Sequence, residues 1–263
     1  MKYLRILLSI FVASVIVAVS YLSYNYFTGP KYRVPYISKC TNNDTLNIAY
    51  IGDSWAVFHN THKCIIEKKL ADSIRRPIAV YTMGICGQTS KEIYESIFDN
   101  PYYRQFFQQR KYDYCFVSAG INDTYKKMST SYYRKSMDGI IRFLIANQIR
   151  AIILEIPDYN IEDAYTHQIF LRRMLREISM YINGTPMDCK QLFRNALDDL
   201  VKQNLYEDKL YIVRYKLWNS NYKCDINNLY WYDGMHLNTN GYTVLDSIIT
   251  KIIIDDYKKR LSF

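Results

Sequence analysis

The sequence predicts an α/β fold in which a five-stranded parallel sheet is covered by helices on both faces. Short apolar segments with the length of buried strands alternate with longer segments whose apolar residues recur at helical spacing. A parallel sheet requires such helices between successive strands, and they bury both of its faces. The alternation runs without repeats or low-complexity tracts, which predicts one domain over residues 46–263 after a linker at residues 30–45.

Three strands are predicted in the first half of this domain. Helices are expected over residues 55–75 and 132–147, where apolar residues recur at helical spacing. Thr89 and Glu92 have the spacing of a capping box, which predicts the start of a helix that continues to Phe98. The predicted strands are residues 47–51, 78–83 and 112–119.

The second half of the domain continues the alternation. Residues 151–156 (AIILEI) form the fourth predicted strand, and Pro157 ends it. Two helices then precede a short fifth strand, and a long helix closes the chain. These elements are expected at residues 163–182, 188–203, 210–213 and 239–260.

The amino terminus has the pattern of an export signal. Two basic residues precede an apolar run over residues 6–19, and the small residues Ala18 and Ser20 would suit cleavage. Aromatic residues extend the run to Phe27, which gives it the length of a membrane span. Residues 1–29 are therefore expected to be an uncleaved membrane anchor, which we favour, or a cleaved signal. The domain would lie outside the cytoplasm in both cases, anchored in the first and secreted or periplasmic in the second.

The composition excludes several classes of protein. Apolar residues make up 49% and charged residues 22%, as in soluble globular chains, and the mean hydropathy of −0.23 excludes a polytopic membrane protein. Lysine and arginine outnumber aspartate and glutamate by 34 to 25. We expect this surplus to attract anionic lipid headgroups or acidic glycans. No nucleic-acid partner is expected, because no nucleic-acid-binding motif accompanies the charge.

Six cysteines in an exported chain would allow disulfides, although their pairing cannot be deduced from the sequence. Cys86 and Cys115 lie in apolar, strand-like segments and are expected to be buried thiols. No CxxC pair is present, so neither a zinc ribbon nor a thioredoxin-type site is expected. The candidates for bridges are Cys40, Cys64, Cys189 and Cys224.

Chemically active residue types follow the predicted strands. Ligands bind at the carboxyl ends of the strands in open parallel sheets, so the residues at these positions are candidates for a site. Glycines accompany them in each segment, although the whole chain has only nine. The segments are GDS at residues 52–54, GICG at 84–87, GIND at 120–123 and DGMH at 233–236.

These residue types suit acyl transfer. Ser54 is a potential nucleophile, and the imidazole of His236 can accept its proton. Asp233 can orient the imidazole and stabilise its charged form. An oxyanion hole needs fixed donors, which the side chain of Asn122 and the backbone N–H groups of Gly87 and Ser54 would supply.

With the four segments in this order, the chain resembles the SGNH, or GDSL-type, hydrolase superfamily over roughly residues 46–257. The resemblance implies a flavodoxin-like three-layer α/β/α sandwich without a metal or organic cofactor. It also implies activity on esters of lipids, thioesters or acylated carbohydrates, and in some members acyl transfer.

The resemblance assigns the roles residue by residue. Ser54 would be the nucleophile, Asp233 and His236 would complete the triad, and Gly87 and Asn122 would be oxyanion donors. The chain departs from the family pattern at two positions. Trp55 stands where an aliphatic residue is more usual, and Gly84 competes with Gly87 for the second role.

Other chemically active residues are expected to have structural roles. Asp53 should anchor the turn before the nucleophile. His59 and His62 form an H-x-x-H pair without a third ligand at metalloprotease spacing, so we expect surface histidines. His167 has no visible partner in the sequence. The α/β-hydrolase alternative fails, because residues 52–56 lack the final glycine of G-x-S-x-G.

The 27 tyrosines admit two interpretations. Several would line a sugar-binding cleft, or they would replace phenylalanine and leucine at half-buried positions, which we favour. Trp231 and Tyr232 beside the DGMH segment, and Trp55 beside the nucleophile, are the candidates for substrate contacts. The other tyrosines considered are Tyr102, Tyr103, Tyr132, Tyr133, Tyr222 and Tyr230.

The sequence therefore predicts an exported serine esterase that hydrolyses O-acyl esters, with acetyl groups on a glycan as the favoured substrate. Three alternatives remain. A lysophospholipase-like enzyme would cleave lipid esters, and an envelope acyltransferase would pass the acyl group to a sugar hydroxyl. A non-catalytic glycan-binding protein would not need the triad residues that this chain retains.

Overall fold

The computed structural model describes residues 2–40, 44–166, 168–202 and 208–262, so the prediction for His167 lies outside the described residues. All five predicted strands are present, and they pair in parallel in the order β2-β1-β3-β4-β5. Strands β1 and β3 are buried throughout, which explains their continuous apolar sequence. The strands are β1 (Leu46–Gly52), β2 (Ile78–Gly84), β3 (Tyr114–Ser118), β4 (Arg150–Leu154) and β5 (Leu210–Val213).

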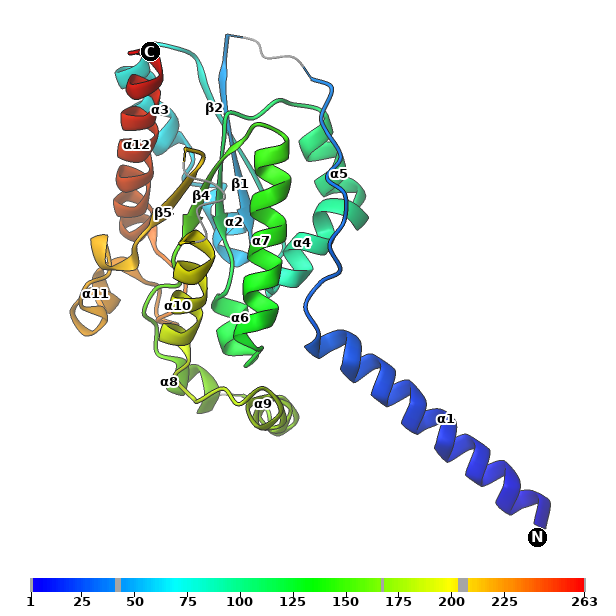
Figure 1. Cartoon of the computed structure of the whole chain (residues 1–263). Coiled ribbons are helices and arrows are strands. Elements are labelled where there is room, and N and C mark those ends of the chain that lie inside the picture. Colours follow the sequence, from blue (N-terminus) through cyan, green and yellow to red (C-terminus); the bar gives the residue numbers. More distant parts are fainter. Residues whose placement is uncertain (1, 41–43, 167, 203–207, 263) are drawn as a thin grey trace.

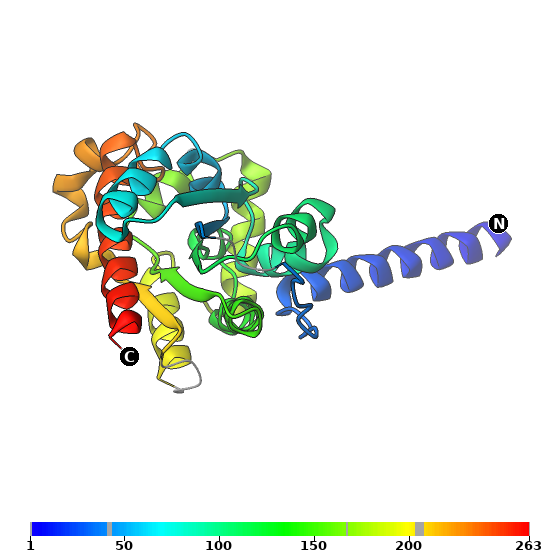
Figure 2. The same cartoon turned by 90° about the horizontal axis from the view of Figure 1, so that it is seen from above.

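Helices cover both faces of this sheet (Figures 1 and 2). One layer consists of α4 (Ser90–Asp99), α5 (Pro101–Gln108), α7 (Thr130–Ala146) and α10 (Lys190–Val201). The opposite layer consists of α3 (Cys64–Ile74) and α12 (Thr239–Leu261), which pack against each other. The predicted capping box at Thr89 and Glu92 is present at the start of α4.

The other helices of the domain gather toward the end of the sheet where the strands finish (Figure 1). They are α2 (Ser54–His59), α6 (Ile121–Tyr125), α8 (Ile161–Thr166), α9 (Phe170–Asn183) and α11 (Tyr222–Leu229). A 3-10 turn, η1 (Tyr215–Leu217), precedes α11. The apolar helix α1 (Lys2–Phe27) leaves the domain toward this end.

The helix predicted over residues 55–75 is in fact two helices. Helix α2 closes at Asn60, whose backbone N–H donates to Val57 O and Phe58 O, and α3 begins at Cys64. The chain changes direction at this break. The side of α2 that faces the core is therefore not the side that the spacing of apolar residues over 55–75, taken as one helix, would indicate.

His59 is consequently buried, and its prediction as a surface residue is wrong. Its Nε2 lies 2.8 Å from Asp246 Oδ1 of α12, and neither side chain is exposed. His62 is partly buried and stacks on Tyr242 with ring centroids 4.9 Å apart. Within the described ranges, no three His, Cys, Asp or Glu side chains are grouped as a metal site.

The cysteines are all free thiols. Cys115 is buried as predicted, and burial raises the pKa of its thiol. Two assignments are corrected. Cys86 is exposed, because β2 ends at Gly84 before reaching it. Cys189, a candidate for a bridge, is instead a buried free thiol at the start of α10.

Residues 30–40 of the segment predicted as a linker pack along the layer of α4, α5 and α7 (Figure 1). Tyr32 donates to Asp138 Oδ2 at 2.7 Å, and Arg33 pairs with Asp99 at 2.5 Å. The ring of Tyr36 lies against Phe98 and Phe143. Residues 29–40 are therefore attached to the domain.

Gly52 is the point at which β1 meets its neighbours at the end of the sheet. It pairs with Gly84 on β2 and with Ser118 on β3, and a Cβ at this position would overlap the hydroxyl and carbonyl oxygens of Ser118. We expect Gly52→Ala to lower the free energy of unfolding by about 1–3 kcal/mol through overpacking. Denaturant titration would measure this. Gly184→Ala is the control, since nothing lies within 4 Å of its added Cβ and only backbone strain remains. The packing argument would be contradicted if Gly52→Ala lowered the free energy of unfolding by no more than Gly184→Ala does.

Asp123 joins α6 to the start of α4 and makes stability depend on pH. Its carboxylate accepts from the Ser90 backbone N–H at 2.8 Å and from the Ser90 hydroxyl at 2.5 Å. Burial raises the pKa of Asp123 from 3.8 to about 7, so the folded state holds its proton more tightly than the unfolded state. The free energy of unfolding should therefore fall as pH rises from about 4 to about 7.

Asp123→Asn removes this titration and should flatten the stability profile over that range. Unfolding by denaturant at several pH values would measure the slope, with Asp72→Asn on the exposed surface as control. The explanation fails if the slope is as steep in Asp123→Asn as in the wild type.

Candidate active site

Ser54 lies at the first turn after strand β1, which pairs with β2 on one side and β3 on the other. It opens helix α2, and its backbone N–H is therefore among those that a helix leaves unpaired at its start. Asp53 caps the helix by accepting from the Trp55 N–H at 3.1 Å, as predicted for an anchor of this turn. Ser54 is 8% exposed, so it is enclosed but reachable.

His236 and Asp233 come from the loop between α11 and α12, and this loop brings them to Ser54. His236 Nε2 lies 2.8 Å from Ser54 Oγ, and His236 Nδ1 lies 2.6 Å from Asp233 Oδ2. With Nδ1–H donating to the carboxylate, Nε2 is left to accept the serine proton. The three residues therefore form one line of hydrogen bonds, in the order that nucleophile, base and orienting acid require.

The loop fixes Asp233 through its own backbone. Asp233 Oδ1 accepts from the N–H groups of Met235 and His236, each at 2.9 Å. Burial alone would raise the pKa of this carboxyl, but the hydrogen bonds from His236 and the loop outweigh burial and lower it. The carboxylate is thus held charged beside the imidazole.

Trp55 does not face the site, which corrects its prediction as a substrate contact. It is 1% exposed, and its ring lies against that of Trp218, with the ring centroids 5.8 Å apart. Its indole N–H donates to Met235 O at 3.2 Å, and its carbonyl oxygen accepts from Tyr242 at 3.0 Å. Trp55 thus connects the helix that carries Ser54 to the loop that carries His236.

Asn122 reaches the turn before Ser54 from the start of α6. Its Nδ2 donates to Asp53 Oδ2 at 3.0 Å, which uses one of the two N–H bonds of the amide. Burial raises the pKa of Asp53 to about 6. Gly120, just before α6, has φ +113°, and a Cβ there would lie 2.6 Å from Ile156 Cδ1. Only glycine therefore lets the chain turn and place Asn122 here.

Gly84, the last residue of β2, and Gly87, which follows the strand, are the two candidates for the glycine of the oxyanion hole, and their surroundings differ. Gly84 packs against the nucleophile turn, since a Cβ there would lie 2.7 Å from Asp53 O. Gly87 has φ +80° and open space around its Cα. It borders a cleft of about 670 Å³. This difference favours Gly87 as the glycine whose backbone faces a ligand.

Aromatic side chains border the imidazole on one side. The rings of Phe58 and Trp231 lie 5.0 Å and 6.3 Å from that of His236, and Trp231 is 41% exposed. Tyr232 is fully exposed next to them. Phe58 was missed in the sequence, although it lies one helical turn after Ser54 and that spacing would have indicated it.

Most of the other tyrosines do not line this site. Tyr222 is half-buried and donates to Gly234 O at 2.8 Å, and Tyr102 is exposed on α5. The remaining ones belong to buried positions, as favoured from the sequence: Tyr103, Tyr132, Tyr133 and Tyr230.

Comparison with known proteins gives one sequence relative and many similar folds. No protein-family model matches the chain. The chain is 28% identical over 208 residues to an N-acylneuraminate cytidylyltransferase of Escherichia coli O18:K1:H7, which covers 77% of this chain and 41% of that protein. The chain therefore spans less than half the length of this curated relative.

Solved structures match over most of the domain. A lipase/acylhydrolase from Enterococcus faecalis has a TM-score of 0.55 at 15% identity and covers 80% of this chain and 96% of its own. A GDSL-like lipase from Bacteroides thetaiotaomicron has a TM-score of 0.51 at 16% identity and covers 80% and 88%. The predicted α/β sandwich is confirmed by these similarities.

Proposed function

Because this chain has the fold of the SGNH, or GDSL-type, hydrolases, we propose that it is a serine esterase. The proposal rests on the line of hydrogen bonds from Ser54 Oγ to His236 Nε2 at 2.8 Å and from His236 Nδ1 to Asp233 at 2.6 Å. Such a line activates a hydroxyl that is otherwise too weak a nucleophile at neutral pH.

The reaction proceeds in two halves. Ser54 Oγ attacks the ester carbonyl carbon while His236 takes its proton, and the oxyanion accepts from the N–H groups of Ser54 and Gly87 and the free N–H of Asn122. The intermediate collapses, His236 gives its proton to the leaving alcohol, and the acyl group stays on Ser54. Water then loses a proton to His236 as it attacks the acyl carbon, and His236 returns this proton to Ser54 Oγ as the bond to the acyl group breaks and the acid leaves.

The substrate we favour is an O-acetyl ester on a glycan. The cleft beside Gly87 contains Gln88, Glu92 and Asn100, which can hydrogen-bond sugar hydroxyls. Trp231, whose ring lies 6.3 Å from that of His236, and Tyr232 beside it in the chain offer exposed rings. The sequence relative is named for N-acylneuraminate, which is a sugar acid, and this supports the same class of substrate.

A lipid ester is the second candidate. The apolar rings of Phe58 and Trp231 beside His236 would suit an acyl chain, and the structural neighbours are named lipases. The two candidates predict opposite preferences for acyl length, and a transferase would differ from both by requiring an acceptor.

The experiment is a series of chromogenic esters with acyl chains from acetyl to decanoyl, assayed with the full chain in detergent. An acetyl esterase should have its highest kcat/KM with acetyl and lose activity steadily with chain length. A preference for long chains would favour the lipid ester instead. Acceleration by added sugar together with little acid release would indicate the transferase. No turnover of any ester, with or without an acceptor, would contradict the proposal.

Helix α1 supports a proposal for the location of the protein. Residues Tyr3–Phe27 form a helix long and apolar enough to cross a membrane, a property that signal sequences share. We favour an uncleaved anchor that holds the domain outside the cytoplasm, with secretion or periplasmic release as the alternative. Amino-terminal sequencing of the mature protein from the membrane fraction distinguishes the two, since cleavage would remove Met1 and the apolar run.

Asn122 offers a test of the oxyanion hole. We expect Asn122→Ala to lower kcat by about 10²–10³-fold with a small change in KM, because the amide would contact the oxygen mainly once it is charged. Asn195→Ala on the exposed side of α10 is the matched control. A loss below about threefold with an intact fold would remove Asn122 from the oxyanion hole.

A further inference from the structure

Helix α9 turns its apolar side away from the domain. At helical spacing its apolar residues lie on one side, in a stripe more than about 100° wide. Surface helices of globular proteins bury such a stripe against the core. Here the stripe is exposed, and its members include Phe170, Leu171, Leu175, Ile178, Tyr181 and Ile182.

The polar side of α9 makes the contacts with the domain. Arg176 is buried, donates to Tyr125 O at 2.6 Å and places its guanidinium 3.5 Å from the centre of the Tyr125 ring. Asn183 Nδ2 donates to Lys127 O at 2.9 Å. These contacts fix the rotation of the helix about its axis, so the apolar side cannot turn inward without breaking them.

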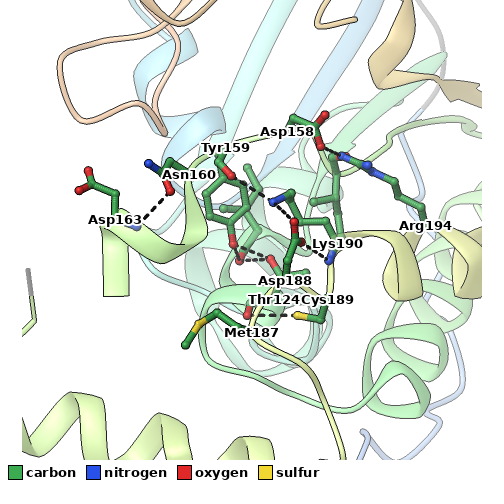
Figure 3. Close-up of polar contacts among 12 residues, drawn as sticks. Thr124, Asp158, Tyr159, Asn160, Asp163, Met187, Asp188, Cys189, Lys190 and Arg194 are labelled. Atoms are coloured by element: carbon green, nitrogen blue, oxygen red, sulfur yellow. Dashed lines mark hydrogen bonds and ion pairs between the residues drawn. The ribbon is translucent and has the colours of Figure 1, made fainter. Parts of the chain in front are cut away.

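The segment that carries α9 is attached firmly at its base. It leaves the domain after β4 and returns at α10, and polar contacts join its two ends (Figure 3). Arg194 pairs with Asp158 at 2.6 Å, and Lys190 donates to Tyr159 O at 3.1 Å and pairs with Asp188 at 2.9 Å. The outward apolar face is thus part of a fixed structure, and a partner must cover it.

The position of α9 indicates which partner. In Figure 1, α9 lies at the end of the domain where the strands finish, which is also the end toward which the apolar helix α1 departs. Helix α9 is seen end-on while α1 runs across the view, so the axes of the two helices point in clearly different directions. A spanning helix and an interfacial helix have this relation when one crosses a bilayer and the other lies in its surface.

Charge supports the same partner. Arg172 and Arg173 are exposed on α9 next to the apolar stripe, where they would meet anionic headgroups. We propose that α9 lies in the surface of an anionic lipid bilayer with its apolar face among the acyl chains. The domain would then contact the membrane at two points, α1 and α9, with the Ser54 end of the sheet toward the bilayer.

The test places a fluorescent probe on the stripe of the full chain. Phe170→Trp and Tyr102→Trp introduce a tryptophan at positions of nearly equal exposure, 75% and 72%, on α9 and α5. Each variant is reconstituted into phosphatidylcholine and phosphatidylglycerol bilayers with or without bromine on the acyl chains, and the wild type supplies the background of the native tryptophans. We expect bromine to quench the added emission of Phe170→Trp by about twofold or more and that of Tyr102→Trp hardly at all.

Nanodiscs that hold one chain each test whether lipid, and not a second copy of this chain, covers the apolar stripe of α9. Quenching of the tryptophan at position 170 should persist in them. Equal quenching at both positions, or none at position 170, overturns the proposal. A blue-shifted but unquenched tryptophan at position 170 that appears only with several chains per bilayer would overturn it in favour of a second copy of this chain. Thermal unfolding of both variants checks that the domain is intact.

Discussion

Ser54→Ala is expected to lower kcat for an acetyl ester by about 10⁴-fold or more, because it removes the only atom that can form the acyl intermediate. The hydroxyl lies 2.8 Å from His236 Nε2, and its loss leaves the base without a nucleophile to activate. A residual rate above that of water would come from the oxyanion donors acting on a water molecule. Initial rates with a chromogenic acetyl ester measure the loss.

Two control measurements test whether the loss of kcat is due to the missing hydroxyl of Ser54. Ser131→Ala removes a hydroxyl from the exposed side of α7 and should leave kcat unchanged. Thermal unfolding of Ser54→Ala should match the wild type closely, since the side chain bonds only with His236 among the contacts described. If Ser54→Ala retains more than about a tenth of wild-type kcat, the nucleophile is elsewhere.

Asp233→Asn is expected to lower kcat by about 10³–10⁴-fold while the fold is kept. An amide NH₂ facing Nδ1 would favour the tautomer with its proton on Nε2, which cannot accept from Ser54. Loss of the negative charge also removes the stabilisation of the imidazolium formed during attack. Steady-state kinetics measure the effect, and the loss should appear in kcat more than in KM.

Asp255→Asn on the exposed side of α12 is the matched control and should behave as the wild type. A second variant tests whether the negative charge at position 233 is what His236 requires. Asp233→Glu keeps the carboxylate and should recover part of the activity if its oxygen can reach Nδ1. A wild-type rate in Asp233→Asn would show that His236 needs no orienting acid.

The strands and their order along the chain could be predicted because burial on both faces leaves a continuous apolar sequence, as in β1 and β3. Short helices were harder to predict. Helix α5 was missed although Asn100 and Pro101 give a helix start signal, and α6 and α11 are too short for periodicity to appear. The parallel order β2-β1-β3-β4-β5 then places the strand ends together.

The residues that meet at the candidate site could be named because each follows a strand or lies shortly before the last helix. The contacts that hold these residues in place could not be predicted from the sequence. The sequence does not show which way Trp55 faces, because Met235 and Trp218, against which its indole lies, are distant in the sequence. The burial of His59 has the same origin, because Asp246 lies far away in the sequence.

The most direct measurement is mass spectrometry of the protein after reaction with a fluorophosphonate. The probe forms a stable bond with an activated serine, so its mass should appear on the peptide that contains Ser54. The adduct should be lost in Ser54→Ala and strongly slowed in His236→Ala. An adduct on a different residue, or rapid ester turnover with Ser54 unmodified, would contradict the assignment of Ser54 as the nucleophile.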